Sequence, residues 1–527
     1  MIANFARRVI RLIGAMRRER DANVTLIAAV TLLPTMFGLG FCIDYARAEM
    51  LQSRINAVAD AAALTATDLL YIEQTSPTPH DAAKTIFTTQ VTDYKDFTQT
   101  SLNIAVTDQG GLNLGRTVVV TWSGLSLNMF SGILGASSLA IGGTSTAYAT
   151  QAPNMNFFLV MDRSPSMLLP TTSTGISSVK GATSDGCAFA CHQQFPGYNY
   201  VKDVDGKGVF IDKDFYNTGN ANAGVYYLIS GSNLYNSAGT KIGTNVSSSN
   251  TTSNTTISYN DLSSNNQSIV GFYADGYWLT HNYTSIYPSG SAIDLRVSDE
   301  TLAAKDLIPY AQGQAVINNV TYQLQFFSYD WTHPSASSPV TQWSTMANVN
   351  SLTSSSVPAL DSNVDWWYVN GQPTSTTGNN DQATETKNML TSMNSVMPTP
   401  GTGLTAASPQ EVMLLITDGV SDENTGSGRV NREFSNADIA ACTTIKNRGI
   451  KIAILYTAYS SAVLVGDSWS QSNVAPYLPN VLPALQSCAS AANDGSPLVY
   501  TVQSDQSISA ALQTLFQLTI ANSHLIG

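Results

Sequence analysis

The chain has 527 residues and a formal net charge of −12, with 43% hydrophobic but only 12% charged residues. An average soluble domain has about 25% charged residues, so this composition excludes a charge-rich disordered chain. The acidic balance argues against nucleic-acid binding, because no basic excess is available to neutralise phosphates. Five cysteines in a chain of this length exclude a small disulfide scaffold. At roughly 150 residues per domain, the length predicts two to four domains.

The charge changes sign near the N-terminus. Residues 1–22 hold six arginines and two acids, a balance of +4, which leaves −16 for the rest of the chain. Residues 24–43 carry no charge, and a helix of that length spans about 30 Å, the thickness of a bilayer core. Because arginines remain on the cytoplasmic side of a membrane, the pattern predicts a cytoplasmic segment 1–23, a transmembrane helix 24–43 and an exported remainder.

A cleaved signal peptide is the alternative interpretation of this apolar run, since Ala46-Arg47-Ala48 has the small-x-small pattern of a cleavage site. The apolar core of a signal peptide is usually about 7 to 15 residues long, which is shorter than this run. A helical pattern also continues through residues 44–70 without Gly or Pro. We therefore expect an uncleaved anchor followed by a membrane-proximal helix within residues 44–76, with an apolar stripe formed by Ile55, Val58, Ala62 and Leu64.

The rest of the chain predicts two α/β regions joined by a hinge at residues 151–154. Residues 77–152 predict a small α/β head, with a helix at 82–91 and strands at 102–106, 117–122 and 138–148. In residues 153–527, continuous apolar runs alternate with helical stretches, which is typical of a doubly wound α/β sheet. The predicted strands are 157–161, 322–329, 412–416, 450–456 and 498–502, and the predicted helices are 293–310, 381–396, 435–448 and 507–520. Residues 196–289 are rich in Ser, Asn, Thr, Tyr and Gly and predict a surface insertion with short β-hairpins.

Two of the predicted strands end in carboxylates. The first ends in Asp162-Arg163-Ser164-Pro165-Ser166, and a later one ends in Thr417-Asp418-Gly419. In open α/β sheets, ligands bind beyond the carboxyl ends of the strands. Carboxylate and hydroxyl oxygens at alternate positions of a tight loop suit a hard cation such as Mg²⁺. The bland alternative is that Ser164 and Ser166 only cap a loop.

This pattern resembles the metal-ion-dependent adhesion site of von Willebrand factor A domains, in which D-x-S-x-S follows a buried strand and a later strand ends in T-D-G. The resemblance implies Asp162, Ser164 and Ser166 as direct ligands of Mg²⁺, or of Mn²⁺ or Ca²⁺, with Asp418 as the second carboxylate. The family also uses a threonine from a separate loop, and the matching segment 400–405 offers Thr402 or Thr405. Two departures are Pro165 between the serines and a shortened helix after residue 405.

The membrane-proximal part resembles the Tad (tight adherence) pilus-assembly proteins. The resemblance is carried by Arg18 to Val24 before the apolar run, by Ile43-Asp44-Tyr45-Ala46-Arg47 after it and by the alanine-rich segment 60–64. The order of anchor, helix, small head and von Willebrand domain resembles TadG-like proteins of bacterial Flp pilus machinery. The resemblance implies a single-pass inner-membrane protein with its bulk in the periplasm or at the cell surface, and other pilus-assembly components or pilin as partners.

The cysteines permit disulfides if the bulk of the chain is exported. Our first expectation pairs Cys442 with Cys488 and, locally, Cys187 with Cys191, although four cysteines allow three pairings. Cys42 lies in the apolar run and is expected to be a small apolar residue. The five histidines do not cluster at ligand spacing, which argues against a zinc site.

Three functions remain open at this stage. The first is a non-enzymatic binding and assembly protein that uses the metal site to recognise a partner. The second is a structural, minor pilin-like subunit or surface fibre component in which the metal only stabilises the fold. The third is a metal-dependent hydrolase, for which the sequence offers no nucleophile elbow, no phosphate-binding glycine loop and no general base beside the two aspartates.

Overall fold

The computed structural model describes residues 20–67, 78–109, 115–130, 136–150, 152–184, 186, 188, 201–212, 225–250, 255–333, 336–360, 383–424, 429–459, 461–465, 468–492 and 495–521. The chain divides into two compact units, one formed by residues 1–110 and 114–151 and the other by residues 111–113 and 152–527. Cys187, Cys191 and most of the predicted cytoplasmic segment 1–23 lie outside the described residues.

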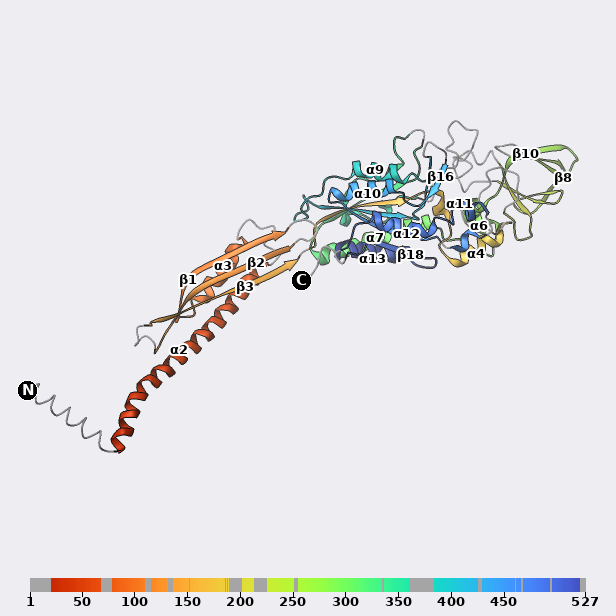
Figure 1. The fold of residues 1–527 in the computed structure, drawn as a ribbon. Coiled ribbons are helices and arrows are strands. Elements are labelled where there is room, and N and C mark those ends of the chain that lie inside the picture. Colours follow the sequence, from red (N-terminus) through yellow and green to blue (C-terminus); the bar gives the residue numbers. More distant parts are fainter. Residues whose placement is uncertain are drawn as a thin grey trace, which may run out of the picture. The chain divides into compact units, whose positions relative to one another are not determined.

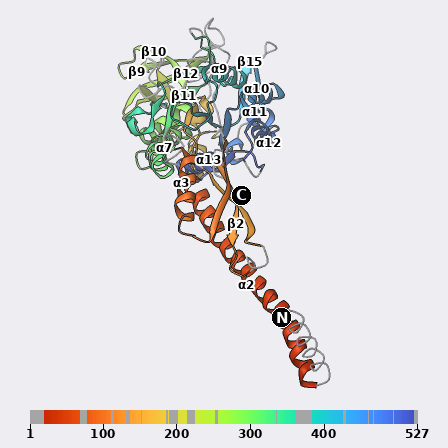
Figure 2. The same ribbon diagram turned by 90° about the vertical axis from the view of Figure 1, so that its left-hand side faces the viewer.

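The first unit consists of a long helix, a short helix and one antiparallel sheet in the order β1-β2-β3. Its elements are α2 (Arg20–Thr67), α3 (Pro79–Val91), β1 (Phe97–Gln109), β2 (Gly115–Leu127) and β3 (Ser138–Thr150). Helix α2 has 48 residues, or about 72 Å at 1.5 Å per residue, and it continues through Pro34. Figures 1 and 2 show the sheet and α3 along the second half of α2.

The two halves of α2 bury different amounts of surface. In the second half, apolar residues three or four positions apart face the sheet and are nearly inaccessible: Ala48, Leu51, Ile55, Val58, Ala59, Ala62, Ala63 and Ala66. Leu64, which we expected in this stripe, is 65% exposed, because it falls on the opposite side of the helix. The first half exposes apolar side chains around its circumference: Val24, Ile27, Val30, Leu32, Leu33, Met36, Leu39, Phe41 and Ile43. Only α2 among the described helices is long and apolar enough to cross a membrane.

The second unit contains a mixed sheet with the strand order β12-β11-β4-β14-β17-β18. The strands from β11 to β18 are parallel, whereas β12 and the short β13 pair antiparallel with β11. Strands β4 and β14 are buried along their whole length, as expected for the centre of a parallel sheet. The bounds are β4 (Met155–Asp162), β11 (Tyr322–Tyr329), β12 (Val340–Gln342), β13 (Ala347–Asn348), β14 (Gln410–Thr417), β17 (Lys451–Thr457) and β18 (Val499–Val502).

Helices cover both faces of this sheet, so the predicted alternation of strands and helices is present. Figure 1 shows α9 and α10 on one face and α7 and α13 on the other; α10 also packs on α12. The helices are α4 (Ser173–Ala182), α6 (Gly276–Ile286), α7 (Arg296–Asn318), α9 (Thr386–Val396), α10 (Asn436–Asn447), α11 (Ser468–Asn473), α12 (Leu478–Cys488) and α13 (Ile508–Ala521). Single turns of 3₁₀ helix are η3 (Pro165–Leu168), η4 (Val349–Ser351), η5 (Ser354–Ser356) and η7 (Ser461–Leu464).

A closed six-stranded barrel occupies the region in which the sequence predicted short hairpins. It has the order β10-β5-β6-β7-β8-β9 and a small apolar core of Phe210, Leu234, Ile257 and Ile269. The strands are β5 (Gly208–Asp212), β6 (Tyr226–Ser230), β7 (Asn233–Asn236), β8 (Lys241–Asn250), β9 (Thr255–Asp261) and β10 (Asn266–Tyr273). The barrel is inserted between α4 and α6, and α6 packs on η3, the turn that follows β4.

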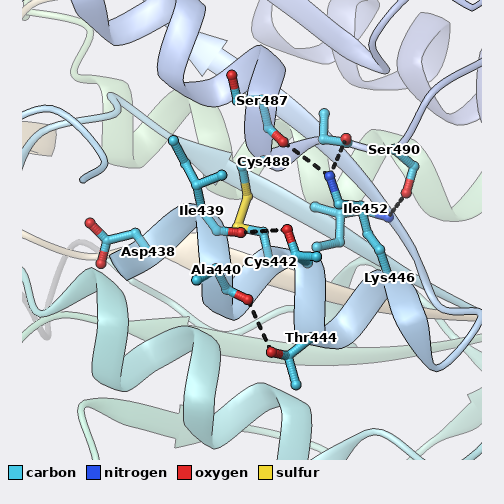
Figure 3. The surroundings of a disulfide bond; sticks show 12 residues. Asp438, Ile439, Ala440, Cys442, Thr444, Lys446, Ile452, Ser487, Cys488 and Ser490 are labelled. Carbon is cyan, nitrogen blue, oxygen red and sulfur yellow. Dashed lines mark hydrogen bonds between the residues drawn. A yellow bond between two sulfur atoms is a disulfide. The ribbon is translucent and has the colours of Figure 1, made fainter. Parts of the chain in front are cut away.

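A disulfide joins Cys442 on α10 to Cys488 at the end of α12, with 5.2 Å between the Cα atoms (Figure 3). Both cysteines are fully buried. Beside the bridge, the Lys446 ammonium donates hydrogen bonds to the carbonyls of Ser487 and Ala489, each at 3.0 Å. These contacts fasten two helices to each other where β17 begins, because Ser490 accepts a hydrogen bond from the Ile452 amide.

Candidate functional site

The first part of the site is the loop that follows β4. Asp162 is the last residue of β4 and is fully buried. Ser164 is extended, and Pro165 begins η3, so the chain leaves the strand and turns at once. The turn brings the Ser164 and Ser166 hydroxyl oxygens to 2.9 Å from each other, while the Ser164 amide donates to Asp162 Oδ1 at 3.0 Å. Asp162 and Ser164 are buried, whereas Ser166 is partly exposed, so the loop reaches solvent at Ser166.

The second part is the T-D-G turn at the end of β14. Strands β4 and β14 are parallel neighbours with Met161 opposite Ile416, and the sheet edge therefore holds both Asp162 and Asp418. Gly419 has φ +75°, and a Cβ atom there would lie 2.4 Å from Val481 Cγ1, so the turn requires glycine. In chain order the strands run 3-2-1-4-5-6, and the two aspartates flank the switch between strands 1 and 4, where such sheets bind ligands.

Hydroxyl groups orient both carboxylates. The Tyr329 hydroxyl lies 2.9 Å from Asp162 Oδ2 and 2.8 Å from Thr417 Oγ1, and Thr417 also donates to Asp162 Oδ2 at 3.1 Å. The Tyr459 hydroxyl donates to Asp418 Oδ2 at 2.7 Å. Burial and the neighbouring carboxylates raise the pKa of both tyrosines well above the usual range. The phenols therefore remain protonated donors and do not act as bases.

A third carboxylate, Glu300 on α7, belongs to the same cluster. Its Oε1 accepts a hydrogen bond from the Asp162 amide at 3.1 Å, whereas no residue that the structure describes donates a hydrogen bond to the buried Oε2. We missed Glu300 in the sequence because a charged residue on a helix is usually exposed. The signal was nonetheless present: Glu300 falls in register with apolar positions three or four residues apart, namely Val297, Ala304, Leu307 and Ala311.

The cluster is short of positive charge. Burial and, to a lesser extent, the nearby Asp418 charge together raise the pKa of Asp162 to about 7. Burial also raises the pKa of Glu300 well above its usual range. Among the described residues, none of the three carboxylates forms an ion pair. Arg163, the residue after Asp162, pairs instead with Asp330 at 2.6 Å, and Arg296 lies 4.7 Å from the Tyr459 ring centre and donates to the Ala458 carbonyl.

The donor set fits a hard divalent cation. All the available donors are oxygens, and a spacing of 2.9 Å between Ser164 and Ser166 is that of neighbouring ligands in an octahedron with bonds of about 2.0–2.1 Å. A cation would also offset the repulsion between Asp162 and Asp418. In the described part of the chain, no three His, Cys, Asp or Glu side chains are grouped as a metal site. The candidate site is therefore one of two carboxylates and hydroxyls, and not a cage of carboxylates or histidines.

Thr402, the threonine that we assigned to this site, lies at the other edge of the sheet. Its loop is bound to the start of β4, where the Asn154 amide donates to the Gly403 carbonyl at 2.8 Å. The eight residues of β4 span about 26 Å, so Thr402 is too far from Asp162 to share an ion. The assignment was wrong because the helix between strands, α9, precedes this loop and does not follow it; Thr405 belongs to the same loop.

The start of α9 instead brings two threonines to the carboxyl edge. The Thr386 hydroxyl lies 2.6 Å from that of Ser421, three residues after Asp418, and the Thr384 amide donates to the Asp422 carbonyl at 2.9 Å. Both threonines are buried. The predicted helix at 381–396 was the signal for this placement, because a crossover helix begins at the carboxyl edge and returns the chain to the amino edge.

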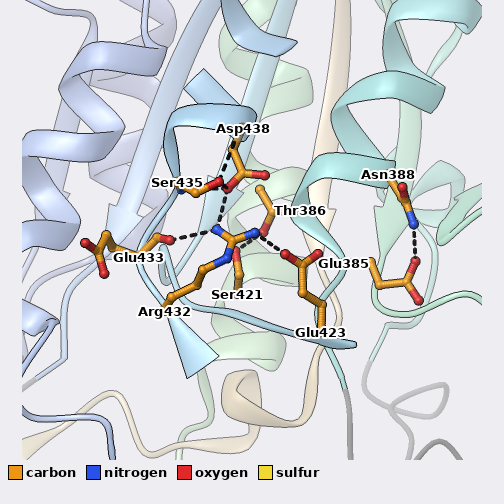
Figure 4. A network of polar contacts seen from close by, with 9 residues as sticks. All are labelled: Glu385, Thr386, Asn388, Ser421, Glu423, Arg432, Glu433, Ser435 and Asp438. Carbon is orange, nitrogen blue, oxygen red and sulfur yellow. Dashed lines mark hydrogen bonds and ion pairs between the residues drawn. The ribbon is translucent and has the colours of Figure 1, made fainter. Parts of the chain in front are cut away.

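An arginine network holds the strands that follow T-D-G (Figure 4). Arg432 pairs with Glu423 and Asp438, and it donates to the Glu433 carbonyl at 2.9 Å. Asp438 also accepts from the Ser435 amide at 2.6 Å as part of the capping box of α10. The network ties the hairpin of β15 (Ser421–Asn424) and β16 (Arg429–Arg432) to α10 and so supports the turn at Asp418.

One family model matches the N-terminal part of the chain. Residues 22–68 match the model of the Flp pilus-assembly TadE/G-like family, named Tad. This segment includes the apolar run and nearly all of α2. No curated protein matches the chain. The family match and the long apolar helix fit a membrane-anchored protein with a role in pilus assembly.

Proposed function

We propose that the protein is a TadG-like component of the Flp pilus machinery, anchored in the bacterial inner membrane by residues 24–43. Its N-terminus lies in the cytoplasm, and both folded units lie in the periplasm or at the cell surface. Three observations support the proposal: the family match at residues 22–68, the apolar half of α2, and the six arginines that precede it. Its partners are other pilus-assembly components or pilin.

We further propose that residues 152–527 form a von Willebrand factor A-like domain that binds a protein partner through a divalent cation. The observation that carries this proposal is the convergence of Asp162, Ser164, Ser166 and Asp418 at the switch point of a sheet ordered 3-2-1-4-5-6. We assign a binding role because hydroxyls and backbone amides contact the side-chain oxygens of the two aspartates, while the third carboxylate, Glu300, contacts the Asp162 amide.

Asp162, Ser164, Ser166 and Asp418 would hold the cation, and Thr386 or Thr384 would take the place that we first gave to Thr402. Mg²⁺ suits these oxygen donors, as do Mn²⁺ and Ca²⁺. When bound, the cation supplies a positive charge that attracts a carboxylate of the partner. The partly exposed Ser166 marks the side on which the partner approaches.

The test is an Asp162→Ala variant, made in cells that assemble pili. We expect loss of pilus display and loss of any partner captured by crosslinking in Mg²⁺ but not in chelator. A matched control is Asp205→Ala, because the Asp205 side chain is exposed and pairs only with a neighbouring lysine. Immunoblots of both variants report the protein level. Normal pilus display by the Asp162 variant would contradict the metal-dependent function.

A structural subunit of the fibre is the second candidate function. The observation that favours it is α2, whose unpacked apolar half is suited to packing against other helices in a fibre. Shearing distinguishes the two functions. A fibre subunit appears in the sheared fraction, whereas an anchored assembly protein remains with the inner membrane.

A further inference from the structure

The turn between β2 and β3 exposes large apolar side chains. Leu127, Met129 and Phe130 are 45%, 64% and 44% exposed. The sequence contains no charged residue from 117 to 150, so strands β2 and β3 and the segment between them contribute no charge of their own after Arg116. Neighbouring apolar side chains that remain open to solvent mark a surface that is covered in use.

Hydrogen bonds and close packing hold Met129 and Phe130 against residues 40–44 of α2. Asp44 is 2% exposed, and its carboxylate accepts hydrogen bonds from the Met129 amide at 2.8 Å and the Phe130 amide at 3.0 Å. One turn earlier on α2, a Cβ atom at Gly40 would lie 2.8 Å from Phe130 Cβ, so glycine allows the phenylalanine to approach the helix backbone. The turn is therefore held beside residues 40–44 of α2.

Residues 40–44 are also where the uncharged run of α2 ends. The run 24–43 matches the thickness of a bilayer core, and Asp44 is the first charged residue after it. We propose that Leu127, Met129 and Phe130 insert into the bilayer interface on the side of the folded head, as a second membrane contact beside the helix. This inference rests on the membrane anchor of the proposed function.

The charged surface next to Ser126, at the end of β2, supports this position of the turn at the bilayer interface. Ser126, the residue before Leu127, lines a hollow of about 380 Å³ together with charged residues from α2 and from the segment before β1: Arg47, Arg54, Asp93, Lys95 and Asp96. Arg47 lies one turn beyond Asp44 on α2. The transition from uncharged to charged surface within one helical turn matches the step from acyl chains to headgroups.

The experiment places a benzophenone amino acid at single positions of the full-length protein in phosphatidylethanolamine–phosphatidylglycerol vesicles. The probe positions are Met129 and Phe130. The control is Tyr148, which is aromatic, 47% exposed and ten residues along β3 from the turn, or about 33 Å. After irradiation, mass spectrometry measures lipid adducts on each protein. We expect adducts at residues 129 and 130 and only background at residue 148.

Three results would overturn the inference: equal labelling at all three positions, adducts at residues 129 and 130 with a second copy of the protein in place of lipid, or no lipid adduct at either residue. Met129 serves as a second probe, because a larger side chain at residue 130 could disturb its contact with Gly40. Alkaline extraction of the wild-type protein tests the anchor separately. If the protein resists extraction but no lipid adduct forms, the anchor stands and the insertion of the turn is wrong.

Discussion

The amino and carboxyl edges of the central parallel sheet, where its strands begin and end, differ in the contacts that their polar side chains make. At the amino edge, amide side chains close the structure: Asn154 binds the Gly403 carbonyl, and Asn156 donates to Glu411 at 3.1 Å. The Cys442–Cys488 bridge fastens the helices that end there. At the carboxyl edge, Asp162 and Asp418 are fully buried and contact hydroxyls and backbone amides, and burial together with the Asp418 charge raises the pKa of Asp162 to about 7. One edge is built for stability, and the other stores an electrostatic cost that a ligand can offset.

The largest effect should come from removing the disulfide at the amino edge. A double Cys442→Ser and Cys488→Ser variant opens a loop of 46 residues, and loop-closure entropy predicts a loss of about 4 kcal/mol in the free energy of unfolding. Denaturant unfolding of the full-length protein in detergent measures this loss, with the reduced wild-type protein as a control. The affinity for Mg²⁺ should be unchanged. A large loss of that affinity would show that the two edges are not independent.

The next largest effect should come from removing one carboxylate charge at either edge and measuring how much Mg²⁺ still stabilises the protein. Isosteric neutralisation is possible at both, with Asp162→Asn at the carboxyl edge and Glu411→Gln at the amino edge; both residues are buried. At a Mg²⁺ concentration of 100 times Kd, the wild-type protein should gain about 2.7 kcal/mol of stability. We expect the Glu411 variant to keep this gain and the Asp162 variant to lose it, as measured by thermal unfolding with and without chelator. A gain in the Asp162 variant would place the ion elsewhere.

The contrast between the edges also explains how far sequence alone can lead. Asp162 and Asp418 could be paired in advance, because each follows a long apolar run and parallel strands share their carboxyl edge. Thr402 was misplaced although the predicted helix 381–396 already came before it, because the family pattern that we followed has its helix after the threonine loop. The burial of Glu300 could be predicted only from the helical spacing of its buried apolar neighbours, because a glutamate itself favours an exposed position.

The barrel illustrates a different limit. Its strands are rich in Ser, Asn and Thr, and the alternation of buried and exposed positions is weak, as in β8. Closure depends on a pairing between β10 and β5, with Gly271 opposite Asp212, nearly sixty residues apart. No local pattern encodes such a contact. The predicted hairpins are therefore present, but their closure into a barrel could not be predicted from local turn signals.

A smaller effect should identify the threonine of the site. Thr386→Val removes a hydroxyl at the carboxyl edge, and Thr402→Val removes an exposed one at the amino edge. We expect the first variant to lower the Mg²⁺ affinity about tenfold, which corresponds to about 1.4 kcal/mol, and the second to leave it unchanged. Isothermal titration of Mg²⁺ into each variant measures the affinity. If Thr386→Val binds as wild type does, Thr384→Val is the next variant, and no change in either would exclude both threonines.

The smallest effect is a pH dependence at the amino edge. Burial raises the pKa of Glu411 to about 7 from an ordinary 4.5, although the hydrogen bond from Asn156 opposes the rise. Within the described ranges, no group donates a hydrogen bond to Glu411 Oε2. The folded protein thus holds this proton more tightly than the unfolded chain does between pH 4.5 and 7. Its contribution to the free energy of unfolding is therefore present below pH 4.5 and is lost as pH rises through 7.

Glu411→Gln should remove this slope. The quantity to follow is the free energy of unfolding of the variant minus that of the wild type. This difference should be about 1 kcal/mol larger above neutral pH than at acidic pH, where both side chains are uncharged. Denaturant unfolding of both proteins across this range measures the difference, and subtraction removes the titration of Asp162 and Glu300, which the two proteins share. A difference that stays constant with pH would mean that Glu411 is solvated. The amino edge would then hold its carboxylate at no electrostatic cost, and it would differ even more from the carboxyl edge, where the pKa of Asp162 is raised to about 7.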